Sequence, residues 1–139
     1  MSTQFGIDVT TDDILDTLSF FDSWEDRYRY IIDLGKELPP MDDALKTEDR
    51  IVKGCQSQVW LAHEEQGGNM NFIADSDAHI VRGLLAVILA AYNGKNRQQI
   101  LDFDIEDYFE RLDLIRHLSP TRGNGLRAMV GRIRDTAAS

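Results

Sequence analysis

Cysteine is nearly absent from this sequence, since Cys55 is the only one in 139 residues. A single thiol excludes an internal disulfide and a cysteine-rich zinc site, because each needs more than one cysteine. It also excludes thiol–disulfide exchange that resolves within one chain. An iron–sulfur scaffold normally needs about four ligands, mainly thiolates, and even a dimer would bring only two cysteines. Any thiol chemistry in this protein therefore depends on Cys55 alone.

Proline and long apolar runs are also scarce. With 3 prolines, 42% hydrophobic residues and 28% charged residues, the composition predicts one compact domain over residues 1–139. The first residues lack the basic and apolar segments of a targeting peptide. The most apolar run, residues 80–92, is too short to span a bilayer and contains Arg82. We expect no membrane association and a cytoplasmic location, where a lone thiol stays reduced.

Basic residues are outnumbered, with 15 Lys and Arg against 24 Asp and Glu and a net charge of −9. This balance opposes binding to nucleic acid or to anionic membranes. The excess lies at the N-terminal end, where residues 1–50 contain 13 acidic and 5 basic residues, a net charge of −8. Solubility and docking to a basic patch on a partner protein both fit this distribution.

Two capped helices are predicted in the first 40 residues. Thr10 and the acidic residues after it are typical of a helix start, and apolar positions 14, 15 and 18 continue that helix. A second helix starts after Asp22-Ser23, has an apolar stripe at Trp24, Tyr28 and Ile31 that we assign to the core, and is stopped by Pro39-Pro40. Residues 41–50 have no sustained hydrophobic periodicity, which predicts a solvated connection.

A β-hairpin and a central helix are predicted next. Residues 59–62 and 70–74 have strand character and flank the turn set 66–69. Asp75-Ser76-Asp77 then resembles a cap for a helix over residues 80–92 that is apolar on nearly every face. We assign the main role of Asp77 to this helix N-cap.

The last third of the chain predicts mostly helix. Short helices are expected at 96–101 and 105–112, a loop at 119–125, and a final helix with an apolar stripe over 126–133. Helices around one hairpin indicate the α+β class, with a small antiparallel sheet packed against helices.

Cys55 lies on a polar segment just before the first predicted strand. Gly54 permits a sharp turn, Gln56 and Ser57 supply polar groups, and Lys53 can favour a thiolate. These neighbours indicate a reactive thiol, although a free cysteine is often a small buried hydrophobe. Two other interpretations stay open. One is a cysteine hydrolase, and the other is an interaction module with an inert cysteine. The histidines that a hydrolase would need are His63, His79 and His117.

Several strings resemble the SufE/CsdE family of sulfur-acceptor proteins and follow the family order over nearly the whole chain after the first two dozen residues. The most specific is Gly54-Cys55-Gln56-Ser57-Gln58-Val59-Trp60, which surrounds the sole cysteine. The others are Trp24-Glu25-Asp26-Arg27-Tyr28, Leu34-Gly35-Lys36, Leu38-Pro39, Asp75-Ser76-Asp77, Ile80-Val81-Arg82-Gly83-Leu84 and His117-Leu118-Ser119-Pro120-Thr121-Arg122. The resemblance implies a SufE/IscU-like fold.

The resemblance also implies a function. In this family a pyridoxal-phosphate-dependent cysteine desulfurase, of the SufS or CsdA kind, holds sulfur from free cysteine as a persulfide. Cys55 would accept that sulfur, and the chain would stimulate the desulfurase and deliver the sulfur to an iron–sulfur scaffold or another acceptor. The chain would then be a sulfur-transfer partner and not a stand-alone enzyme, with no cofactor or metal of its own. A homodimer stays open.

The resemblance assigns supporting roles around the thiol. Gly54 and Gln56 belong to the cysteine loop, and Asp77 lies in a segment that influences desulfurase binding. Arg122 matches a family arginine on the loop before the last helix. There it would hydrogen-bond the cysteine loop or favour thiolate or persulfide charge; a solvated arginine is the alternative. Trp60 is expected in the core.

Overall fold

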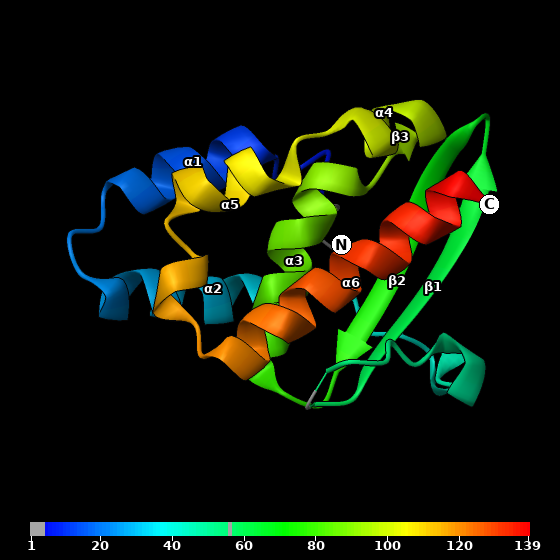
Figure 1. Ribbon diagram of the computed structural model, residues 1–139, viewed down its shortest axis with the longest axis horizontal. Coiled ribbons are helices and arrows are strands. Elements are labelled where there is room, and N and C mark those ends of the chain that lie inside the picture. Colours follow the sequence, from blue (N-terminus) through cyan, green and yellow to red (C-terminus); the bar gives the residue numbers. More distant parts are fainter. Residues whose placement is uncertain (1–4, 56) are drawn as a thin grey trace.

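The structure, a computed structural model, describes residues 5–55 and 57–139. Its elements in chain order are α1 (Thr11–Ser19), α2 (Trp24–Lys36), the 3₁₀ turns η1 (Asp43–Leu45) and η2 (Glu48–Arg50), β1 (Val59–Gln66), β2 (Asn69–Ser76), α3 (His79–Tyr92), β3 (Lys95–Asn96), α4 (Arg97–Asp102), α5 (Ile105–Leu112), η3 (Ile115–His117) and α6 (Pro120–Ala138). Helices packed around an antiparallel sheet confirm the predicted α+β class (Figure 1).

The sheet is built on the predicted hairpin. β1 and β2 pair antiparallel from Val59 opposite Ser76 to Gln66 opposite Asn69. The turn between them consists of two glycines with positive φ, 60° at Gly67 and 84° at Gly68. Two positive φ angles suit the right-handed twist of paired strands, and glycine adopts them without a steric penalty. The short third strand, β3, was not predicted, because two residues show no periodicity.

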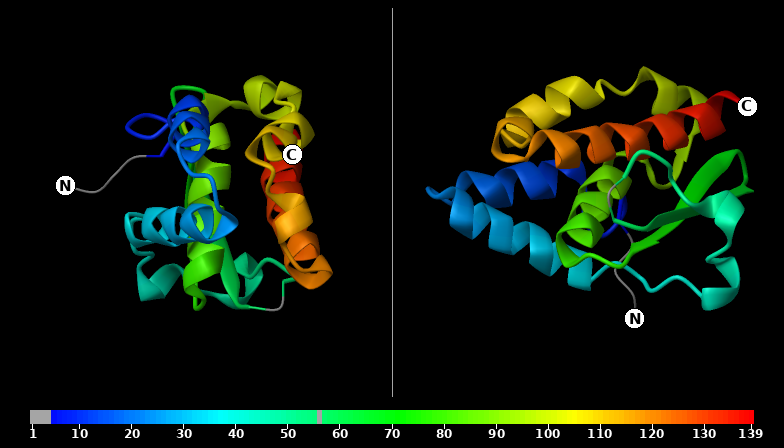
Figure 2. Two further views of the ribbon diagram at one scale, coloured as in Figure 1. Left: turned by 90° about the vertical axis from the view of Figure 1, so that its left-hand side faces the viewer. Right: turned by 60° about the horizontal axis from the view of Figure 1, so that its bottom comes forward.

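The central helix α3 is the middle of the core, as predicted. Every residue from Gly83 to Tyr92 is buried. The helix lies between α2 on one side and α6 on the other (Figure 2), and its first residues follow directly from β2. Because both flanks are covered by other helices, an apolar residue is favoured at almost every position of α3.

Two glycines let α2 and α3 cross closely. A Cβ added at Gly83 would overlap the Ile31 carbonyl oxygen, and one added at Gly35 would lie 2.5 Å from the Gly83 nitrogen. Ile31 is itself buried, whereas Trp24 is half-buried and Tyr28 is 37% exposed. The expectation that all three form core is therefore wrong for Tyr28, because α2 contacts α3 through its later turns.

The segment Asp75-Ser76-Asp77 does not cap α3 as predicted. Strand β2 continues through Ser76, and the N-cap of α3 is Ala78, which has no side-chain capping bond. Asp75 is instead a buried carboxylate that pairs with Arg82 and, at 3.2 Å, with Lys46 Nζ. Arg82 also donates to the carbonyl oxygens of Gly35 and Leu38. This charge network ties the end of β2 to α3, to the end of α2 and to the connection after it.

The last helix starts earlier than predicted. Residues 120–125, expected in a loop, form the first turns of α6, so the loop prediction is wrong there. The Ser119 side chain caps the helix by accepting from the Arg122 amide, and Pro120 occupies the first turn, where a missing N–H costs no bond. These two residues offset the low helix propensity of Gly123 and Gly125.

The connection over residues 41–50 is less irregular than predicted, because it contains η1 and η2. The two capped N-terminal helices are confirmed, with a capping box between Thr10 and Asp13 on α1 and a Ser23 cap on α2. Within residues 5–55 and 57–139, no helix is long and apolar enough to cross a membrane.

Candidate functional site

The Cys55 loop, residues 53–58, is closed at its base by the sheet. The Val52 amide donates to the Val59 carbonyl at 2.8 Å, and Ile51 forms an isolated antiparallel bridge with Trp60. The loop therefore starts and ends at adjacent points of β1. It lies at the end of the hairpin where β2 passes into α3, opposite the two-glycine turn (Figure 1).

Ser76 and Asp77 hold the C-terminal side of this loop. The Gln58 amide donates to Asp77 Oδ1 at 3.1 Å, and Ser76 Oγ donates to the Gln58 carbonyl at 2.7 Å. The Asp77 amide also reaches the Gln58 carbonyl, at 3.4 Å. The structure thus places the Asp77 carboxylate at the loop base, and its assignment to a helix cap is wrong.

Glycine and alanine positions bring the loop tip against α6. Gly54 has φ 95°, a conformation that favours glycine. A Cβ at Gly54 would lie 3.3 Å from Ala128 Cβ, and a Cβ at Gly125 would lie 3.6 Å from Cys55 Sγ. The half-buried Cys55 thiol donates to the Gly125 carbonyl at 3.5 Å. Since S–H is a weak donor, this bond holds Cys55 only weakly.

A small cavity borders the Cys55 thiol. Its volume is about 20 Å³, which is room for roughly one water-sized atom. The cavity is lined by residues of the loop, of α3 and of the first turns of α6, namely Cys55, Ser57, Val81, Thr121, Arg122, Gly125 and Met129. Arg122 Nη1 is buried and has no hydrogen-bond partner among the described residues. Arg122 therefore lines the same cavity as the thiol, and one of its buried donor atoms has no partner among the described residues.

Burial controls the charge of this thiol. It raises the pKa of Cys55 above the ordinary value, because removal from water disfavours the thiolate. Lys53, which we expected to favour a thiolate, is exposed and is not among the causes of the shift. The closed loop consequently favours the protonated thiol.

The three histidines do not join the Cys55 cavity. His117 stacks on Trp24, with 4.3 Å between ring centroids, and faces Asp113 at 3.4 Å. His63 lies on the exposed part of β1, and His79 is exposed at the start of α3. None of them lines the cavity. The cysteine–histidine pair that a hydrolase requires is thus absent from the described cavity.

Two further residues were predicted for the loop and the core, Gln56 and Trp60. Gln56 lies outside the described residues. Trp60 is half-buried and not fully in the core, and Lys46 Nζ lies 5.2 Å from the centroid of its ring. Among residues 5–55 and 57–139 there is no group of three or more His, Cys, Asp or Glu side chains able to hold a metal ion.

Sequence reasoning missed most of the cavity wall. Thr121 and Gly125 were assigned to a loop, and Val81 and Met129 were treated only as core. The adjacent Ser119 and Pro120, which are typical of a helix start, were the available signal that α6 includes these residues. Nothing local in the sequence indicated that its first turns meet Cys55.

Comparison with known proteins places this chain in a family. Residues 12–137 match the SufE family, described as an Fe-S metabolism associated domain. Uncharacterized SufE-like proteins of Rhizobium meliloti and Rhizobium etli are each 48% identical over 130 residues, which cover 91% of this chain and 93% and 88% of theirs. The solution structure of a hypothetical protein from Thermus thermophilus has the same fold, with a TM-score of 0.74, 17% identity and coverage of 92% and 93%. The chain belongs to the SufE family, whose domain is associated with Fe–S metabolism.

Proposed function

We propose that Cys55 accepts persulfide sulfur from a pyridoxal-phosphate-dependent cysteine desulfurase and passes it on for iron–sulfur cluster assembly. The observation that carries this proposal is the cavity of about 20 Å³ beside the thiol, which is lined by Arg122, whose buried Nη1 has no partner among the described residues. The cavity has room for about one added atom, and a persulfide adds one sulfur atom to a cysteine. The family's link to Fe–S metabolism supports the same role.

The transfer step needs no oxidant or reductant. The Cys55 thiolate attacks the terminal sulfur of the desulfurase persulfide, forming a new S–S bond to Cys55. The S–S bond of the desulfurase breaks, and its cysteine leaves as a thiolate. The product is Cys55–S–SH, or its anion once the proton is lost. Because the chain has no second cysteine, an internal disulfide cannot form and displace the sulfur.

Loop opening prepares Cys55 for this attack. Only the thiolate is nucleophilic, and burial raises the pKa of Cys55 in the closed loop. Release of the weak Sγ–H bond to Gly125 moves the thiol into water or into the desulfurase site, where that penalty is lost. In this proposal the chain is a carrier and an activator of the desulfurase, and it does not turn over substrate by itself.

After transfer, the cavity protects the sulfur on the way to the acceptor. A persulfide is more acidic than a thiol, and its anion accepts from a guanidinium donor such as Arg122 Nη1. Return of the loaded loop to α6 would shield the terminal sulfur from small thiols. The reducing cytoplasm, where we propose that the chain works, contains many such thiols.

Mass spectrometry tests the proposal directly. The protein is mixed with a desulfurase of the SufS or CsdA kind, its pyridoxal phosphate and free cysteine. We expect the mass of one sulfur atom on Cys55, and none on Cys55→Ser or on wild type without the desulfurase. An active desulfurase that leaves wild type unmodified would show that Cys55 is not an acceptor. If Cys55 is alkylated in the absence of a partner protein but gains no sulfur from the active desulfurase, a different thiol function is favoured.

A further inference from the structure

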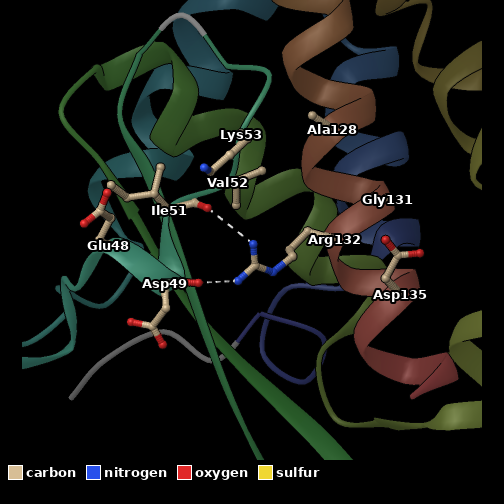
Figure 3. Close-up of a pocket in the computed structure, with 9 residues that line it drawn as sticks. All are labelled: Glu48, Asp49, Ile51, Val52, Lys53, Ala128, Gly131, Arg132 and Asp135. Atoms are coloured by element: carbon tan, nitrogen blue, oxygen red, sulfur yellow. Dashed lines mark hydrogen bonds between the residues drawn. The ribbon is translucent and has the colours of Figure 1, made fainter.

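The segment that leads into the Cys55 loop is separated from α6 by a groove. The groove has a volume of about 770 Å³ and lies between residues 48–53 and the middle of α6. Its lining residues are Glu48, Asp49, Ile51, Val52, Lys53, Ala128, Gly131, Arg132 and Asp135 (Figure 3). Val52 is buried in the core, but the groove leaves space between the rest of this segment and the helix.

Arg132 bridges the groove. From α6 its guanidinium donates to two backbone carbonyls of the segment, through Nη2 to Asp49 at 2.7 Å and through Nη1 to Ile51 at 3.3 Å (Figure 3). The planar fork of an arginine side chain lets one group hold two acceptors in a fixed relation. Ile51 also bridges to Trp60, so the start of the loop is held between β1 and α6.

The helix that carries Arg132 is firmly placed. Ile133, the next residue, is fully buried, and Met129, almost one turn earlier, is 2% exposed. Near the helix end, Arg97 Nη1 donates to the carbonyls of Thr136 and Ala137. Arg132 thus connects the segment that leads into the Cys55 loop to a helix that is held in place by its own packing.

The contacts that α6 makes with the loop differ in strength along one helix face. Gly125, Ala128 and Arg132 are spaced by three and four residues, which puts them on one side of the helix. Gly125 offers the loop tip its carbonyl oxygen, 3.5 Å from Cys55 Sγ, and Ala128 offers a methyl group that a Cβ added at Gly54 would meet at 3.3 Å. Arg132 holds the loop base with two bonds. The tip is thus weakly attached and its base strongly attached.

We propose that Arg132 is a positioning residue that sets how often the Cys55 loop opens. By holding the carbonyls of Asp49 and Ile51, it keeps the loop base in the position from which Cys55 reaches Gly125. Without the bridge, the base shifts into the groove and the tip leaves α6 more often. This inference rests on the proposed function only in taking the open loop as the form that meets the sulfur donor.

The alkylation rate of Cys55 by iodoacetamide tests the proposal without a desulfurase. The neutral reagent forms an Sγ–C bond and releases iodide and a proton, so a change in protein charge does not steer it. For Arg132→Gln we expect a rate increase of about tenfold, since alkylation follows the population of the open loop and two charge-assisted bonds are lost. Arg132→Lys keeps the charge but not the fork, and we expect it to be at least about threefold faster than wild type.

Arg127→Gln is the matched control. It removes the same charge from the same helix, but Arg127 pairs with Glu106 on α5 and not with the loop. We expect its alkylation rate to equal that of wild type. Unfolding midpoints for each variant show that the rates are measured on folded protein. If Arg132→Gln does not fold, the alkylation rate of Cys55 in Arg132→Lys alone tests the proposal.

Two outcomes overturn the inference. One is a wild-type alkylation rate in both Arg132 variants, and the other is an equal increase in Arg127→Gln, which would indicate general loosening of α6. Neither outcome affects the proposed function, which fails only if wild type accepts no sulfur from an active desulfurase. The two proposals can therefore be rejected separately.

Discussion

At the residue scale, the site depends on two groups that differ in charge and partners. The Cys55 thiol has a raised pKa and one weak bond, to the Gly125 carbonyl. Arg122 lines the same cavity, and its Nη1 is buried with no partner among the described residues. An unpaired buried donor is costly, so the arrangement favours arrival of an anion. Under the proposed function, a persulfide on Cys55 would supply that anion.

This pairing predicts the effect of replacing Arg122. In Arg122→Gln, we expect the Cys55 persulfide to be lost to a small thiol about tenfold faster than in wild type, because one charge-assisted hydrogen bond is missing. Arg122→Lys should be intermediate, since it keeps the charge without the fork. The measurement is a mass-spectrometric time course of the loaded protein after addition of the thiol.

A matched control for Arg122 is Arg116→Gln. Arg116 is 73% exposed and pairs with Asp113 on the surface, away from the cavity lining. Its loaded form should lose sulfur at the wild-type rate. If Arg122→Gln retains the persulfide as long as wild type and Arg116→Gln do, Arg122 does not stabilise the loaded state.

At the element scale, the charge network around Asp75 joins parts that the sequence does not place together. Asp75 at the end of β2 meets Arg82 on α3 and Lys46 after η1, and Arg82 reaches the end of α2. The Ser76 amide also donates to Asp75 Oδ1, at 2.8 Å. The Cys55 loop is hydrogen-bonded to the two residues that follow Asp75. The network therefore fixes the support on which the loop base rests.

We expect Asp75→Asn to destabilise the fold strongly. Removal of the negative charge leaves two cations facing a neutral amide, and breaking such a buried pair costs about 3–5 kcal/mol. The control is Asp43→Asn, because Asp43 pairs with the same Lys46 but is 97% exposed, and exposed pairs contribute about 0–1 kcal/mol. Urea unfolding measures both changes. Equal losses in the two variants would contradict a structural role for the buried network.

The sequence predicts helices and strands correctly where the signal comes from residues close together in the chain. Thr10 and Ser23 start helices as capping rules predict, and the two-glycine turn closes the hairpin. The prediction was wrong where contacts between distant residues determine the role of a residue. Asp77 has the composition of a cap but bonds Gln58, which is 19 residues earlier. Gly125 is typical of a loop but lies inside α6, where its carbonyl oxygen accepts from Cys55 Sγ, 70 residues earlier.

At the scale of the whole molecule, the cavity beside Cys55 exists because three distant segments meet. The loop, α3 and α6 each provide part of its wall. A cavity of about 20 Å³ accepts one atom but not a larger group. We therefore expect the size of a group attached to Cys55 Sγ to affect the stability of the entire fold.

Two adducts of Cys55 test this size limit. The persulfide form adds one sulfur atom, and we expect its unfolding temperature to equal or exceed that of the free thiol form. The methylthio adduct, formed with methyl methanethiosulfonate, adds a sulfur and a carbon atom and should lower stability by about 1–3 kcal/mol through overpacking. Differential scanning calorimetry compares both with unmodified protein. A persulfide form that melts as low as the methylthio form would show that the cavity does not hold the sulfur.

Local signals in the sequence were enough to define most of the elements and to identify the one thiol. Capping residues, helical periodicity and the hairpin turn act between near neighbours, so they can be recognised without knowing the rest of the fold. The folded chain was needed to show that Arg122 shares a cavity with Cys55, that Asp77 holds the loop base and that Arg132 bridges to Asp49. These contacts join residues 19 to 83 positions apart. They depend on how α3 and α6 pack around the sheet, and no local preference encodes that packing.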